Sequence, residues 1–151
     1  MPDGAEFVCR GAEAGDLEAL LSLYSQLSIK DPVLPLALAR ARLGEMLEMP
    51  GLYLGIGEVR GRVAASAVLV LVPNLTRSAR PFGMIENVVT DAAMRGRGFG
   101  KRLIQHLLAH AREANAYKVM LMTGRTDESV LHFYESCGLQ RGTKTAFEIR
   151  F

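Results

Sequence analysis

Residues 95–101 of the chain read RGRGFGK and stand immediately before a long amphipathic pattern that predicts a helix. Glycine at alternate positions lets the backbone approach a ligand closely. The first N–H groups of a helix have no partner inside the helix, and the helix dipole favours an anion beside them. Positive charge is added there by Arg95, Arg97, Lys101 and Arg102. The segment therefore predicts a turn that binds phosphate or pyrophosphate.

Spacing excludes the two commonest phosphate-binding motifs. A P-loop that ends at Lys101 requires glycine where Arg95 stands, and serine or threonine where Arg102 stands. A dinucleotide-binding fingerprint that starts at Gly96 requires a third glycine where Lys101 stands. The alternative that stays open is a solvated basic turn before an ordinary helix.

The rest of the chain predicts strands and helices in alternation. Two apolar runs, 52–59 and 63–72, are joined by Arg60-Gly61-Arg62, as in a hairpin. The second run is apolar at almost every position, so we expect it at the centre of the sheet. The expected strands are 7–10, 52–59, 63–72, 84–90, 118–123 and 143–151, and the expected helices are 17–27, 36–49, 99–115 and 128–136. This order predicts an α/β fold, a mixed sheet with helices on both faces.

Length and charge limit the class of protein. The 151 residues suffice for one domain with its own core, and no linker or repeat interrupts them, so we expect a single domain over residues 1–151. The composition excludes a disordered chain and a disulfide-rich scaffold. The 18 lysines and arginines nearly balance the 16 acidic residues, which argues against a nucleic acid or a membrane as partner.

Cysteine and histidine positions predict no metal site. Cys9 and Cys137 match no zinc or redox spacing, and we expect two reduced thiols. His106 and His110 are four residues apart on the polar side of a predicted helix, so we expect them to be solvated. The N-terminus lacks the basic and apolar stretches of a signal peptide, and no apolar run is long enough for a membrane helix. A cytoplasmic location is the expectation.

Two motifs together resemble a known family. The first is Arg95-x-x-Gly98-x-Gly100, placed after an apolar strand and before an amphipathic helix, and the second is FYESCGL at residues 133–139. Their order and separation are similar to those of the GNAT N-acetyltransferase superfamily, and the first motif resembles its acetyl-coenzyme A motif. The resemblance implies a mostly antiparallel mixed sheet in which a splayed pair of strands holds coenzyme A.

The resemblance also implies a set of binding residues. The pantetheine arm would lie between strand 84–90 and strand 118–123, and the Val88 N–H would polarise the thioester carbonyl. Asp127 stands where the family commonly has asparagine. The implied residues for coenzyme A are Val88, Val89, Thr90, Arg95, Gly96, Arg97, Gly98, Phe99, Gly100, Lys101, Asp127 and Tyr134.

Two residues are candidates for catalysis. Tyr134 matches the family's general acid, which protonates the departing thiolate, and the alternative is a core tyrosine with a satisfied hydroxyl. Glu86 is an acid inside an apolar strand, where burial would raise its pKa towards that of a general base. The alternatives for Glu86 are a substrate anchor or a structural hydrogen-bond partner.

We therefore expect an acetyltransferase that moves acetyl from acetyl-coenzyme A to the primary amine of a small molecule, by direct attack in a ternary complex. Residues 85–89, 116–119 and 150–151 resemble glucosamine-6-phosphate N-acetyltransferases, and Arg77 and Arg80 would suit an anionic acceptor. The alternatives are a non-catalytic acyl-coenzyme A sensor and an enzyme acting on a protein or peptide amine. The resemblance implies a homodimer.

Overall fold

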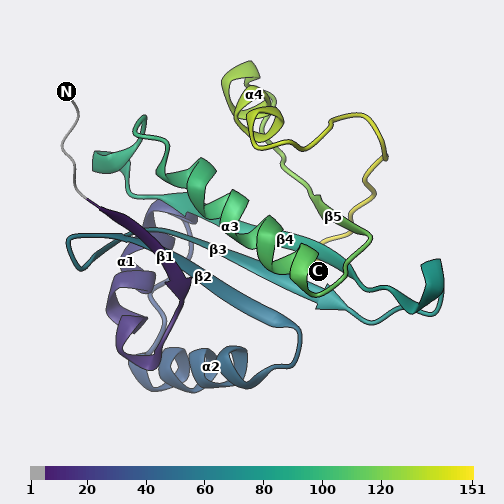
Figure 1. Cartoon of the computed structure of the whole chain (residues 1–151). Coiled ribbons are helices and arrows are strands. Elements are labelled where there is room, and N and C mark those ends of the chain that lie inside the picture. Colours follow the sequence, from purple (N-terminus) through teal and green to yellow (C-terminus); the bar gives the residue numbers. More distant parts are fainter. Residues whose placement is uncertain (1–5) are drawn as a thin grey trace.

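A single five-stranded sheet forms the centre of the molecule, whose computed structural model describes residues 6–151 (Figure 1). The strands lie in chain order, each beside the next. The first four pair antiparallel, and the fifth pairs parallel with the fourth. Their bounds are β1 Phe7–Gly11, β2 Leu52–Val59, β3 Arg62–Val72, β4 Phe82–Thr90 and β5 Lys118–Leu121. The predicted mixed, mostly antiparallel sheet is confirmed.

Helices cover both faces of the sheet, as predicted. Figure 1 shows α3 on one face, with α1 and α2 on the other. The fourth helix, α4, contacts α3. The bounds are α1 Leu17–Leu27, α2 Leu36–Glu48, α3 Phe99–Glu113 and α4 Glu128–Ser136, with short 3-10 turns at Ala14–Asp16, Arg77–Ala79 and Ala92–Met94. No helix within residues 6–151 is both long enough and apolar enough to cross a lipid bilayer.

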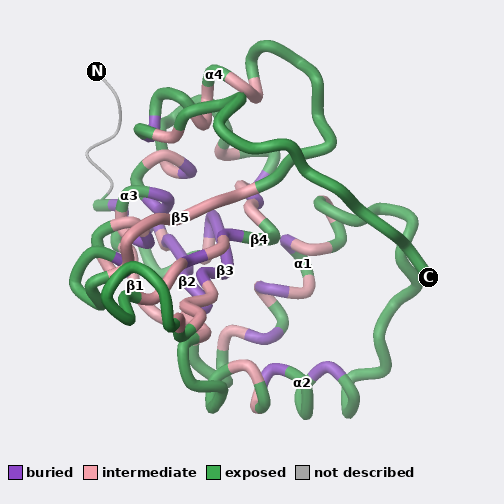
Figure 2. Tube along the Cα trace, turned by 90° about the vertical axis from the view of Figure 1, so that its right-hand side faces the viewer, coloured by how far each residue is buried: buried purple, intermediate pink, exposed green. Residues whose placement is uncertain are grey.

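The central strand β3 is buried on both of its faces, which confirms its predicted place. Every residue from Ala64 to Leu69 is buried. On one face β3 packs against Leu103 and Leu107 of α3, and on the other Val68 packs against α1 and α2. Figure 2 shows the buried residues gathered in the strands and on the sides of the helices that face them. Full burial of one such side chain stabilises the fold by about 1.5–3 kcal/mol.

An aromatic pair joins the first strand to the start of α3. The rings of Phe7 and Phe99 stack with their centroids 4.5 Å apart. The Phe7 ring occupies the space above Gly57, where an added Cβ would lie 2.1 Å from the ring. The Arg102 guanidinium also contacts the Phe7 ring, 4.9 Å from its centroid, and donates a hydrogen bond to the Phe7 carbonyl. The first turn of α3 is thus attached to β1, about ninety residues earlier in the chain.

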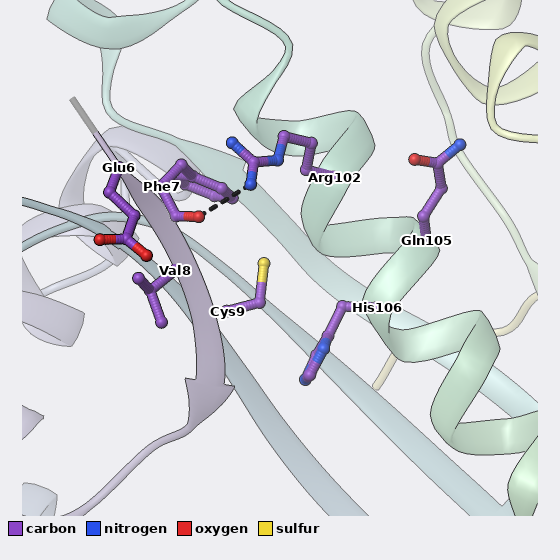
Figure 3. A pocket seen from close by; sticks show the side chains of 7 residues that line it. All are labelled: Glu6, Phe7, Val8, Cys9, Arg102, Gln105 and His106. Carbon is purple, nitrogen blue, oxygen red and sulfur yellow. Dashed lines mark hydrogen bonds between the residues drawn. The ribbon is translucent and has the colours of Figure 1, made fainter. Parts of the chain in front are cut away.

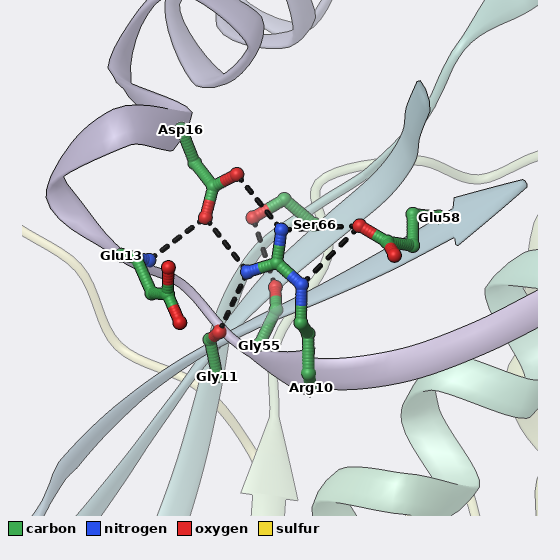
Figure 4. A network of polar contacts seen from close by, with 7 residues as sticks. All are labelled: Arg10, Gly11, Glu13, Asp16, Gly55, Glu58 and Ser66. Atoms are coloured by element: carbon green, nitrogen blue, oxygen red, sulfur yellow. Dashed lines mark hydrogen bonds and ion pairs between the residues drawn. The ribbon is translucent and has the colours of Figure 1, made fainter. Parts of the chain in front are cut away.

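A network of charges joins β1, β2 and the segment before α1 (Figure 4). Arg10 donates to both carboxylate oxygens of Asp16, at 2.9 and 3.0 Å, and to Glu58 at 3.0 and 3.2 Å. Asp16 also accepts the backbone N–H of Glu13. Asp16 stands at the N-cap of α1, but its side chain accepts no hydrogen bond from the first turn of that helix and binds Arg10 instead.

The last predicted strand, 143–151, is wrong. This segment is not a strand, and every residue from Gln140 to Phe151 is exposed (Figure 2). Phe147 and Ile149 are 93% and 77% exposed. The alternation of apolar and polar residues is that of a strand, but a strand also requires pairing with another strand, and this segment pairs with none of the strands described within residues 6–151.

We predict that Arg10→Ala lowers the free energy of unfolding by roughly 2 kcal/mol, because it leaves Asp16 and Glu58 without their shared cation. Arg42→Ala is the control, since Arg42 forms an exposed pair with Glu45 and its loss changes stability by less than about 1 kcal/mol. Urea unfolding of the three proteins measures both changes. Equal stability of the Arg10 variant and the wild type would contradict the prediction.

The same network predicts a pH dependence of stability. Arg10 lowers the pKa of Asp16 below its ordinary value. The contribution of Asp16 is therefore complete above its unfolded pKa of about 3.9 and is lost as the pH falls through the folded value. We expect the difference in stability between the wild type and Arg10→Ala to shrink as the pH is lowered from 6 to 3. A constant difference across that range, measured by urea unfolding, would argue against the role of Asp16.

Candidate active site

A bulge in β4 lies at the centre of the candidate site. Glu86 pairs with Val68 and Val89 pairs with Ser66, so that the two residues Asn87 and Val88 lie opposite the single residue between Ser66 and Val68. Asn87 has a φ of +53°, a left-handed conformation that asparagine tolerates better than most residues. Such a bulge interrupts the ladder and leaves backbone groups without a strand partner. Val88 is the residue whose N–H was predicted to face the thioester.

Strands β4 and β5 part at the same place. Their pairing runs from Phe82 opposite Lys118 to Ile85 opposite Leu121, where β5 ends. The strand β4 continues for five more residues, to Thr90, with no strand on that side. The predicted separation of these two strands is confirmed. Residues 86–90 of β4 therefore present an open edge next to the bulge.

The glycine-rich turn follows directly from this open edge. Gly96 and Gly98 have φ values of +77° and +78°, and Gly98 is the last residue before α3. No atom lies within 4 Å of a Cβ built on either glycine, so the backbone conformation, and not crowding, favours glycine here. Arg95 donates from Nε to the Thr90 carbonyl at 3.2 Å. The turn is exposed and places the N-terminus of a 15-residue helix beside the end of β4.

Gly100 is where β4, α3 and α4 meet. A Cβ on Gly100 would lie 3.1 Å from the Phe133 ring and 3.1 Å from the Thr90 hydroxyl. Phe133 packs against the core that α3 forms with the sheet. The absence of a side chain at Gly100 therefore permits α4 to approach the start of α3. The two motifs found in the sequence are in contact in the fold.

Tyr134 and Glu86 are brought into the same neighbourhood. Burial raises the pKa of the Tyr134 phenol above its ordinary value, and electrostatic interaction with Cys137 and Glu86 raises it further. The phenol therefore keeps its proton at neutral pH, as a proton donor must. Glu86, in contrast, is exposed. The expected burial of its carboxylate is wrong, because no strand lies on the β5 side of β4 beyond Ile85 and the bulge interrupts the alternation of faces.

Asp127 has a partner that the sequence analysis missed. Its carboxylate accepts a hydrogen bond from Arg125 Nε at 2.9 Å and a second one, through the same oxygen, from Arg125 Nη2. The Asp127 carbonyl accepts the N–H groups of Val130 and Leu131 in the first turn of α4. The opposite charges of Arg125 and Asp127, two residues apart, could have predicted this pair from the sequence, but such pairs are common in solvated loops and do not by themselves indicate a site.

Arg77 and Arg80 lie away from the other predicted site residues. Both precede β4, whereas the glycine-rich turn follows it, and nine strand residues span roughly 30 Å. Arg80 donates to the carbonyls of Asn115 and Ala116, each at 3.1 Å, and so secures the end of α3. The Arg77 guanidinium lies 5.6 Å from the Tyr117 ring centroid. The structure does not bring this pair together with Glu86, Tyr134 or the turn.

A shallow pocket between β1 and α3 contains His106 and Cys9 (Figure 3). His106 Nε2 and the Tyr53 hydroxyl share a hydrogen bond of 2.8 Å, and the His110 ring stacks on Tyr53 at 4.2 Å. Both histidines are half-buried, because Tyr53 of β2 packs against them. The prediction that they are solvated is therefore wrong. Burial lowers the pKa of His106. Across residues 6–151 no three histidine, cysteine or acidic side chains form a group that would hold a metal.

Comparison with known proteins agrees with this geometry. The model of the acetyltransferase (GNAT) family matches residues 18–139. A curated glucosamine 6-phosphate N-acetyltransferase from Trypanosoma brucei brucei is 34% identical over 142 residues, which cover 93% of each chain. Glucosamine 6-phosphate N-acetyltransferase 1 from Oryza sativa subsp. japonica is 33% identical, over 90% of this chain and 82% of its own length.

A solved structure is similar over almost the whole fold. It is a putative acetyltransferase from Agrobacterium tumefaciens strain C58, 49% identical to this chain, with a TM-score of 0.92. The match covers 95% of this chain and 99% of the other. Strands β2 to β5, the bulge and the glycine-rich turn all lie within residues 18–139, which the family model matches.

We predict that Gly98→Asp weakens acetyl-coenzyme A binding by at least about tenfold, because it adds a negative charge where the helix N-terminus and Arg95, Arg97 and Lys101 favour an anion. Gly61→Asp is the matched control: Gly61 has a φ of +76°, has open space around it and lies in the β2–β3 hairpin. Calorimetric titration compares the two variants. Wild-type affinity in Gly98→Asp would exclude the turn as the binding site.

Proposed function

The chain belongs to the acetyltransferase (GNAT) family, and on that premise we propose that its acceptor is an amino sugar phosphate, with glucosamine 6-phosphate as the first candidate. It is an N-acetyltransferase, and acetyl-coenzyme A is its cosubstrate. Both curated relatives described above are named for glucosamine 6-phosphate. The observation that supports catalysis most is that Glu86, next to the bulge of β4, is close enough to Tyr134 for its charge to raise the pKa of the phenol. We treat residues 1–151 as one catalytic domain and keep the predicted cytoplasmic location as part of the proposal.

The cosubstrate would bind along the open edge of β4. Backbone N–H groups of the glycine-rich turn and the first turn of α3 face the pyrophosphate, with Arg95, Arg97 and Lys101 close by. The backbone of Val88, Val89 and Thr90 is available to the pantetheine amides, since β5 ends before this part of β4. Gly96 and Phe99 belong to the same segment, and Asp127 immediately precedes α4.

The chemistry requires two proton transfers. The acceptor attacks the thioester carbonyl as the neutral amine, so that a C–N bond forms, and the attacking nitrogen gives its proton to Glu86. The Val88 N–H stabilises the negative charge on the carbonyl oxygen as it develops. The C–S bond then breaks, and Tyr134 donates its proton to the departing thiolate. Solvent takes the proton from Glu86 and returns one to Tyr134, which restores the enzyme.

We propose that the chain works as a homodimer in which residues 143–151 pair with a second copy. This segment alternates apolar and polar residues, and its apolar side chains are exposed. The outer edge of β5 is likewise without a strand partner among residues 6–151. An unpaired strand sequence and an unpaired edge in one chain are complementary between two copies.

We predict that Tyr134→Phe lowers kcat at least about tenfold while the affinity for acetyl-coenzyme A stays the same, because only the proton donor is removed. Tyr117→Phe is the control, since Tyr117 lies at the other end of the sheet beside Arg77 and Lys118. Steady-state assays with thiol detection give kcat, and calorimetry gives the affinity. Turnover equal to that of the wild type would remove Tyr134 from the mechanism.

We also predict that Phe147→Ser combined with Ile149→Ser converts a dimer into a monomer, because the exposed apolar face is then polar. Leu75→Ser is the matched control, since Leu75 is 98% exposed in the β3–β4 loop. Sedimentation velocity at micromolar concentration measures the mass. A monomeric wild type, or a double variant that stays dimeric, would contradict the proposed assembly.

A further inference from the structure

We infer that Arg125 recognises the phosphate of the acceptor, a specificity role that rests on the proposed function. An amino sugar phosphate carries a cationic amine at one end and an anionic phosphate at the other. The site described above offers Glu86 for the amine, but it offers the phosphate no cation apart from those of the turn. Arg77 and Arg80, the residues predicted for this purpose, lie at the far end of β4.

The topology places Arg125 at the end of the sheet where β4 and β5 separate. Because β5 runs parallel to β4, the loop that follows Leu121 leaves β5 at the end towards which β4 also runs. That end borders the open edge at residues 86–90 and the glycine-rich turn. Between residues 122 and 136, a stretch that also contains Tyr134, Arg125 is the only lysine or arginine.

Asp127 holds the arginine in a defined position. One oxygen of Asp127 accepts from both Nε and Nη2 of Arg125, and the Arg125 backbone N–H donates to the Thr123 hydroxyl at 3.1 Å. The side chain is 67% exposed, and Asp127 is the one partner of its guanidinium within residues 6–151. A guanidinium has five N–H donors in a planar fork, so three donors are left for the oxygens of a phosphate.

The other cations near the site have different partners. Arg141 binds Glu128 and Glu135 on the surface of α4, and Lys118 lies against Phe82 and Tyr117 at the start of β5. Arg95, Arg97 and Lys101 belong to the turn that would bind the pyrophosphate of the cosubstrate. Arg125 is thus the cation that the geometry leaves for the acceptor.

The test compares wild-type enzyme, Arg125→Ala and Arg125→Lys, with glucosamine 6-phosphate and glucosamine as acceptors at saturating acetyl-coenzyme A. For glucosamine 6-phosphate, we expect Arg125→Ala to raise KM at least about tenfold with kcat within roughly twofold. Its kcat/KM for glucosamine, which has no phosphate, should stay at the wild-type value. Arg125→Lys should recover part of the loss, because it keeps the charge but not the planar fork.

Arg40→Ala, which removes an exposed arginine from α2, is the control and should leave every parameter unchanged. An equal loss of kcat/KM for both sugars would overturn the inference, because Arg125 would then not distinguish the phosphorylated sugar from the unphosphorylated one. A raised KM for acetyl-coenzyme A with no change for the sugar phosphate would also overturn it, and would assign Arg125 to the cosubstrate.

A binding measurement separates this inference from the proposed function. Thermal unfolding of the protein saturated with coenzyme A is followed with and without glucosamine 6-phosphate. A rise in Tm for the wild type and none for Arg125→Ala supports the inference even if turnover of this sugar is absent. Equal rises in both proteins overturn the role of Arg125 alone, and no rise in either overturns both the role and the proposed acceptor.

Discussion

The site depends on the point at which β4 loses its neighbour. Pairing with β5 ends at Ile85, and the bulge at Asn87 and Val88 follows at once. A continuous ladder would have used every backbone donor along this strand, since buried N–H groups are almost always paired. The separation therefore makes main-chain donors of β4 available to a bound molecule, although β4 lies between two other strands of the sheet. The roles proposed for the turn, Tyr134 and Glu86 all depend on this gap.

Contacts outside the gap fix the positions of the elements that surround it. The stack of Phe7 on Phe99 attaches the start of α3 to β1, and the close approach of Phe133 to Gly100 attaches α4 to α3. Gln26 of α1 accepts the N–H of Ala92, which connects the opposite face of the sheet to the segment before the turn. These contacts come from distant parts of the chain, so the geometry of the site belongs to the fold as a whole and not to the motif alone.

Local patterns predicted the elements well, whereas long-range placement was the source of the errors. The turn and α3 were predictable, because the glycine spacing and the 3.6-residue period of apolar residues are both visible within one short, continuous stretch of sequence. The exposure of Glu86 was not, since it depends on where β5 ends. Arg77 and Arg80 were misplaced for a similar reason: closeness to a strand in sequence does not say which end of the strand holds the site. Residues 143–151 have a strand pattern but pair with no strand described within residues 6–151, and the alternation of residues alone does not say whether a strand partner is in place.

The left-handed backbone at Asn87 also has an evolutionary consequence. Glycine, the residue that adopts this conformation most freely, is two nucleotide changes away from either asparagine codon. Single changes include those to isoleucine and threonine, whose branched side chains oppose the conformation, and to aspartate, which would add negative charge beside the proposed site of the carbonyl oxygen. Several one-step mutations here thus disturb either the bulge or the charge distribution around it. Drift at this codon should be slow even among relatives whose acceptors differ.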